Sequence, residues 1–158
     1  MTESVRTALR SLVHGQVDRH DRRVRGFAEP EWRRYADLLA GALLLAARRR
    51  FAPGADRAAV IRFVASARER YDVTGLDVDP TVAEALIRAV LGECPAPPDD
   101  AATLTATTLL LLGLLEDEGM TPADLDDLLT AAWATAEGEP AGTAGPVVPA
   151  GQPEPGTT

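Results

Sequence analysis

The sequence predicts an all-α protein: a compact bundle of five or six helices, followed by a disordered C-terminal tail. Apolar residues recur at the three- and four-residue spacing of a helix face in six successive segments. Proline and glycine stand between these segments, where they interrupt helices. The segment 138–158 holds five Gly and five Pro with little apolar content. Such a segment cannot bury enough apolar surface to offset its chain entropy, so we expect one helical domain, 3–137, and a tail, 138–158.

The first helix is expected from Ser4 to about Arg25. Its apolar stripe consists of Val5, Leu9, Leu12, Val13, Val17 and Val24, with Gln16 and His20 on the same face. On the polar face, Asp18 precedes Arg22 by four residues and Asp21 precedes Arg25 by four, which is the spacing of stabilising ion pairs. Much of the local positive charge is therefore expected to be balanced.

The second helix is expected to begin near Pro30 and to run to about Phe51. Its middle, residues 38–47, is apolar on every side, which is typical of a helix buried among others. The three arginines 48–50 fall in its last turn, where positive charge suits the negative end of the helix dipole. This helix is predicted to be the centre of the bundle.

Four more helices follow, and capping residues mark their starts. They are expected at about 56–71, 79–91, 100–117 and 121–136. Asp79-Pro80 places an aspartate cap before a proline, and Thr121 with Asp124 has the spacing of a capping box. Four threonines in the fifth helix lower its helix propensity, and its helical assignment depends on its context.

Composition and charge restrict the classes of function. All 16 basic residues are arginines at or before Arg88, and the net charge is −8. The longest apolar run, 38–47, has half of the ~20 residues that span a bilayer, and the start of the chain does not resemble a signal peptide. The single cysteine excludes an intramolecular disulfide. These features predict a cytoplasmic protein without a membrane span, whose basic first third faces its acidic last third within the domain or across a dimer.

One face of the expected first helix could bind a divalent metal. His14, Asp18 and Asp21 stand at positions i, i+4 and i+7 and would offer nitrogen and oxygen ligands. A fourth ligand would have to come from another helix, and both aspartates have an arginine four residues later. The pattern favours a solvated ionic face, and we predict no cofactor.

Four other features of the sequence have a chemical and a structural interpretation. His20 lies on an apolar stripe and could be a buried base, although an imidazole hydrogen-bonded to a neighbouring side chain is favoured. Cys94 follows a helix end among acidic residues, which oppose thiolate formation, so an inert thiol is expected. The acidic residues of 72–84 do not match the spacing of a calcium loop. Pro146-Val147-Val148-Pro149 has the form of a polyproline II ligand, but a plain linker is the favoured interpretation.

The exposed arginines suggest an interaction surface. The candidates are Arg22, Arg25, Arg33, Arg34, Arg48 and Arg49. Phosphate binding needs an uncompensated basic surface, whereas this chain is acidic overall, and it contains no glycine-rich phosphate loop. Nucleic acid is therefore an unfavoured partner.

Several short segments together resemble a group of known proteins. They are 35–39, 45–51, 61–64 and 77–80, which read YADLL, LAARRRF, IRFV and DVDP. Over residues 5–135 the chain resembles small, uncharacterised all-helical proteins of high-GC Gram-positive bacteria. The resemblance implies no activity, cofactor or catalytic residue.

The sequence therefore predicts a non-enzymatic, cytoplasmic interaction or regulatory module that binds another protein or a second copy of itself as a homodimer. Two alternatives stay open: an arginine-mediated nucleic-acid-binding protein and a small helical metal-dependent enzyme.

Overall fold

A computed structural model describes residues 2–75 and 77–138, and this part of the chain contains seven α-helices and no strand. The helices are α1 (Thr2–Val13), α2 (Val17–Val24), α3 (Glu29–Arg50), α4 (Arg57–Tyr71), α5 (Pro80–Val90), α6 (Ala101–Asp117) and α7 (Pro122–Gly138). The all-α prediction is confirmed, but the described residues form seven helices instead of the expected five or six. The predicted tail lies, from residue 139 onward, outside the described residues. None of the described helices combines the length and the apolar character needed to cross a membrane.

The expectation of a single helix over 4–25 is wrong, because the chain turns at Gly15. Gly15 has φ +74°, its N–H donates to the Leu12 carbonyl at 2.9 Å, and the Gln16 N–H donates to the Ser11 carbonyl at 2.8 Å. This pair of bonds is the glycine-based Schellman motif, which ends a helix. Val17, predicted to be on the apolar stripe, is 52% exposed. The helical spacing of apolar residues continues past the end of α1 into α2, so it does not reveal that a helix ends there.

The other helices agree with the sequence, and their predicted caps are present. The Asp79 side chain accepts a hydrogen bond from the Thr81 N–H at 2.7 Å, at the start of α5. At the start of α7, the Asp124 N–H donates to the Thr121 hydroxyl at 3.2 Å, and the Thr121 N–H donates to the Asp124 carboxylate at 2.9 Å. In α6, threonine hydroxyls donate to backbone carbonyls four residues earlier, so their polar groups are satisfied inside the helix.

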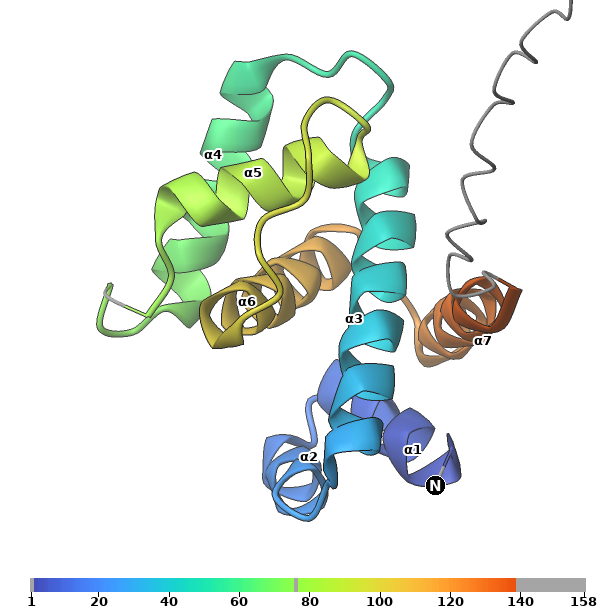
Figure 1. Ribbon diagram of the computed structural model, residues 1–158. Coiled ribbons are helices and arrows are strands. Elements are labelled where there is room, and N and C mark those ends of the chain that lie inside the picture. The colour runs from blue at the N-terminus through green and yellow to red at the C-terminus, as the bar shows by residue number, and fades with distance from the viewer. Residues whose placement is uncertain (1, 76, 139–158) are drawn as a thin grey trace, which may run out of the picture.

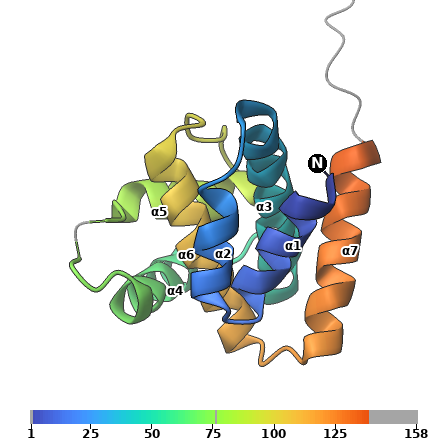
Figure 2. The same ribbon diagram turned by 90° about the horizontal axis from the view of Figure 1, so that it is seen from below.

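Helix α3 runs through the middle of the molecule, with α5 and α6 on one side and α7 on the other (Figure 1). Seen from below, α1 lies between α2 and α7 (Figure 2). Leu39 and Leu43 of α3 are 0% and 1% exposed, which confirms the prediction that this helix is the buried centre of the bundle.

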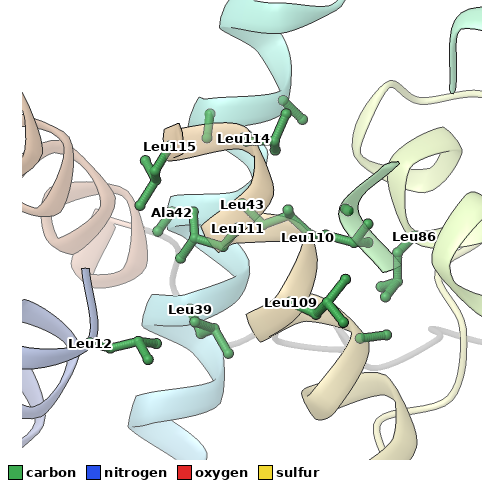
Figure 3. Packing of buried hydrophobic residues seen from close by; sticks show 14 of the residues in the cluster. Leu12, Leu39, Ala42, Leu43, Leu86, Leu109, Leu110, Leu111, Leu114 and Leu115 are labelled. Atoms are coloured by element: carbon green, nitrogen blue, oxygen red, sulfur yellow. The ribbon is translucent and has the colours of Figure 1, made fainter. Parts of the chain in front are cut away.

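Leucine and alanine make up most of the core, together with a few valine and aromatic side chains. Leucines of α6 (Leu109, Leu110, Leu111, Leu114 and Leu115) pack around Leu39, Ala42 and Leu43 of α3 (Figure 3). Burying a leucine side chain completely contributes about 1.5–3 kcal/mol relative to leaving it in water. These contacts between α3 and α6 therefore provide much of the free energy that holds the bundle together.

The charge asymmetry of the sequence leads to contacts within the domain. The Arg10 Nε lies 3.0 Å from the Asp126 Oδ1, and the His14 Nε2 lies 3.4 Å from the same oxygen. The Arg6 guanidinium lies over the Trp133 ring, 5.1 Å from its centroid. Basic α1 therefore faces acidic α7, although exposed pairs of this kind contribute only about 0–1 kcal/mol each.

Candidate interaction surface

One face of α3 is only partly covered by the rest of the bundle. It consists of Asp37, Ala40, Gly41, Leu44 and Arg48, which follow one another at the helical spacing, and we call it the outer stripe of α3. Asp37, Ala40 and Arg48 are exposed, while Gly41 and Leu44 are half-buried. The remaining apolar faces of α3 are directed into the core. The middle of this helix, predicted from the sequence to be buried on every side, is therefore only partly buried within one copy of the chain.

A groove with a volume of about 650 Å³ lies along the outer stripe. Its other walls come from α5, the connection that follows α5, and α7, and they include Ala89, Val90, Ala96 and Ala136. Small side chains leave this space because alanine and glycine do not reach across it.

Helix α7 forms its wall of the groove by a close approach to α3. A Cβ atom added to Gly41 would lie 3.4 Å from the Ala132 carbonyl oxygen and 3.7 Å from the Ala132 Cβ. These distances leave little space between the two helices. Glycine at position 41 therefore helps to set the width of the groove.

The two ends of the outer stripe carry opposite charges. Asp37 and Arg48 are eleven residues apart on one helix, which corresponds to about 16 Å along its axis. Neither side chain makes an ion pair with any residue that the structure describes. The groove therefore presents an apolar middle between an unpaired carboxylate and an unpaired guanidinium.

The structure does not gather the six candidate arginines into one surface. All are exposed, namely Arg22, Arg25, Arg33, Arg34, Arg48 and Arg49. Arg33 is paired with Glu29 at 3.2 Å, and the Arg22 Nε donates to the Asp18 carbonyl at 3.2 Å. Arg34 and Arg48 are separated by fourteen helical residues, or about 21 Å. Arg48 alone of the six lines the groove, and an interaction surface formed by the others stays a prediction.

The proposed metal-binding face does not form, because the chain turns between its members. His14 lies in the turn after α1, and its Nε2 faces Asp126, whereas Asp18 and Asp21 belong to α2. Asp21 is bound to His20. Among residues 2–75 and 77–138, no three His, Cys, Asp or Glu side chains are placed to hold a metal ion. The predicted pairs of Asp18 with Arg22 and Asp21 with Arg25 are likewise absent as side-chain ion pairs in the described structure.

His20 is buried and has two side-chain partners. Its Nδ1 lies 3.0 Å from the Asp21 Oδ1, and its Nε2 lies 2.8 Å from the Tyr35 hydroxyl oxygen. A carboxylate only accepts hydrogen bonds, so Nδ1 carries the proton, and in the neutral imidazole Nε2 accepts from the Tyr35 hydroxyl. Burial and the nearby charge of Asp21 raise the pKa of Tyr35, which keeps that hydroxyl protonated. The favoured interpretation of a hydrogen-bonded imidazole is confirmed.

The acidic segment between α4 and α5 is organised by Asp72. This buried carboxylate accepts hydrogen bonds from the N–H groups of Asp77 at 3.3 Å and Val78 at 3.1 Å. Burial acts to raise the pKa of Asp72, but these backbone bonds outweigh it and the pKa lies below its usual value. The carboxylate thus stabilises its own loop.

Cys94 is half-buried, with its Sγ 3.5 Å from the Ala85 carbonyl oxygen.

The outer stripe of α3 is a feature that the sequence alone did not predict. The signal was present in the spacing of Asp37, Leu44 and Arg48, which places two opposite charges on either side of an apolar residue on one face. It was concealed because an entirely apolar segment predicts burial on every side.

The remaining candidate and the comparisons with known proteins add no further site. Pro146-Val147-Val148-Pro149 lies outside the described residues. No known protein family matches the chain, and no curated protein and no solved structure shows detectable similarity to it. The resemblance to helical proteins of high-GC Gram-positive bacteria stays a prediction.

Proposed function

We propose that this protein is a non-enzymatic interaction module that associates with a second copy of itself through the outer stripe of α3. One observation carries the proposal: a partly covered helix face with the half-buried Leu44 at its middle and the unpaired charges of Asp37 and Arg48 at its ends. A partner for this face must offer an apolar middle, a cation beside Asp37 and an anion beside Arg48.

The outer stripe itself meets all of these requirements. In a twofold dimer every contact occurs twice: where one residue of the first copy contacts a different residue of the second copy, the same pair also meets with the two copies exchanged. Two antiparallel α3 helices would set Asp37 of each copy opposite Arg48 of the other. Leu44 would then lie opposite Gly41 of the other copy, so that the apolar middles of the two stripes meet. The outer stripe of one copy thus complements the outer stripe of an antiparallel second copy in charge and in apolar character.

The same contacts limit the strength of the association. Stable complexes bury ~800 Å² on each partner, and a pair of single helices with short flanking walls covers less than that. Charge pairs at an accessible rim contribute about 0.2–1 kcal/mol each. We therefore expect a dissociation constant on the order of micromolar. Such an association suits a regulatory module whose state responds to its own concentration.

Sedimentation velocity over a range of protein concentrations tests this proposal. Asp37→Arg would place two arginines opposite each other, and Arg48→Asp would place two aspartates opposite each other. We expect each change alone to weaken the dimer about tenfold or more, because like charges repel. The double variant exchanges the two charges and should restore dimerisation close to the original affinity.

Arg62→Asp provides the matched control, because Arg62 is an exposed arginine of α4 that does not line the groove. This change should leave the dimer intact, and circular dichroism should show the same helix content in every variant. A wild-type chain that stays monomeric up to about millimolar concentration contradicts self-association. A dimer that the double variant fails to restore contradicts the α3 interface.

A further inference from the structure

A second cleft lies away from the outer stripe of α3 and shares no residue with its groove. It has a volume of about 460 Å³, within the ~300–1,000 Å³ of small-molecule sites. Its lining comes from α2, α3, α4 and α6 and from the segment before α5. The lining includes three of the seven Phe, Trp and Tyr residues of the chain: Trp32, Tyr35 and Tyr71.

The aromatic side chains form walls at different angles. The rings of Trp32 and Tyr35 are 5.9 Å apart between centroids and meet at 88°. Tyr71 enters from α4, and Leu109 and Leu112 of α6 add apolar surface. This arrangement offers both aromatic and aliphatic contact to a compact ligand.

Most hydrogen-bond donors of the cleft are already used. The Tyr35 hydroxyl donates to His20, and the Tyr71 hydroxyl donates to Glu116. The hydroxyls of Thr105 and Thr108 donate to carbonyls of their own helix, at 2.9 and 3.0 Å. What these groups still present to the cleft are oxygen lone pairs, which attract positive charge. Tyr35 is buried, and the Arg70 guanidinium already lies over the Tyr71 ring, 5.7 Å from its centroid, so the half-buried Trp32 provides the aromatic surface for a cation.

Among the residues that the structure describes, the Asp77 carboxylate is the only charged side chain that lines the cleft, apart from the titratable His20. Its backbone is fixed, because the Asp77 N–H donates to the buried Asp72. None of the chain's arginines lines the cleft. The Tyr71 hydroxyl stays neutral at physiological pH, since burial and then the bond to Glu116 raise the pKa of Tyr71 to about 12.

We infer that this cleft binds a small organic ammonium ion, with the cation against Trp32 and Asp77 and an apolar body against the leucines of α6. A carboxylate or phosphate ligand would find no cation in this lining, and a neutral apolar ligand would not use Asp77. Contact between a cation and an aromatic ring is favourable, and more so where water is excluded. The site is independent of the proposed dimer.

Choline and 3,3-dimethylbutan-1-ol provide a matched pair of probes, because they have nearly the same shape and differ in charge. We expect choline to bind at least about fivefold more tightly, as measured by titration of amide and indole ¹H–¹⁵N NMR signals, with the largest shifts at Trp32 and Asp77. Asp77→Asn should weaken choline binding about threefold to tenfold and leave the alcohol unaffected. Trp32→Leu should weaken it as well.

Trp133→Phe is the control, since Trp133 lies outside this cleft. It should leave choline binding unchanged, and thermal unfolding should establish that each variant is folded. Equal binding of the two probes overturns the inference, as does choline binding that shifts neither Trp32 nor Asp77. An Asp77→Asn variant that folds and binds choline with unchanged affinity also overturns it.

Discussion

The Nε2 atom of His20 lies 2.8 Å from the hydroxyl oxygen of Tyr35, and both side chains are buried. This hydrogen bond joins the short helix α2 to the central helix α3. Helix α2 has eight residues and a strongly polar sequence, so it has little means of its own to stay in place. We regard the His20–Tyr35 bond as the main polar attachment of α2 to the bundle.

Tyr35→Phe should therefore destabilise the protein. The change leaves the His20 Nε2 buried without a donor, at an expected cost of about 1–3 kcal/mol in the free energy of unfolding. Urea denaturation followed by circular dichroism measures this cost. Combining Tyr35→Phe with His20→Leu removes both partners and should cost less than the sum of the single changes. Strict additivity would show that the bond contributes nothing.

Gly15→Ala should destabilise the turn between α1 and α2. Gly15 has φ +74°, a conformation that costs a residue with a Cβ about 1–2 kcal/mol, even though the added methyl group would meet open space. Gly26→Ala is the control, since its φ lies outside that region and its nearest contact is 3.5 Å away. Equal effects of the two changes on the urea midpoint would argue against a conformational role for Gly15.

Leu43→Ala should be among the most costly changes in the chain. Leu43 of α3 is 1% exposed and packs against α6. Truncating such a side chain lowers the free energy of unfolding by about 2–5 kcal/mol, because it also leaves a cavity. Val73→Ala is the control, since Val73 is 94% exposed and should contribute less than about 0.5 kcal/mol. A small loss of stability in Leu43→Ala would mean that α3 is not the centre of the core.

Asp72 should make stability depend on pH in the acid range. Its folded-state pKa is depressed, so its contribution is fully present above the unfolded pKa of about 3.9 and is lost as the pH falls through the folded value. Asp72→Asn should lower stability at neutral pH and flatten the decline of stability below about pH 4. Thermal unfolding from pH 7 to pH 2 measures both. If the decline of stability at acid pH were the same in the Asp72→Asn variant as in the original chain, Asp72 would not stabilise the loop as proposed.

The helical class and five of the helices could be predicted because local signals determine them. Asp79-Pro80 and the Thr121–Asp124 box act within one turn, so the sequence carries them in full. The end of α1 is different. Gly15 alone marks it, and an isolated glycine within a periodic segment predicts a break only weakly.

The sites depend on contacts that no local pattern encodes. Sequence spacing indicates that His20 faces inward, but it does not show that Tyr35, on another helix, meets it. The outer stripe of α3 is similar. Its exposure depends on where α5 and α7 end their contact with α3, and that position depends on packing at Gly41 and Ala132.

The distance between identical positions on two copies tests the α3 interface most directly. In the background Cys94→Ser, spin labels are placed at Glu29→Cys or at Arg50→Cys, and the distance between copies is measured by electron-spin dipolar spectroscopy. An antiparallel pair centred between Asp37 and Arg48 predicts about 40 Å for the label at position 29 and about 22 Å for the label at position 50. Two similar distances, the reverse order, or no dipolar coupling at a concentration where the chain sediments as a dimer would contradict association through α3.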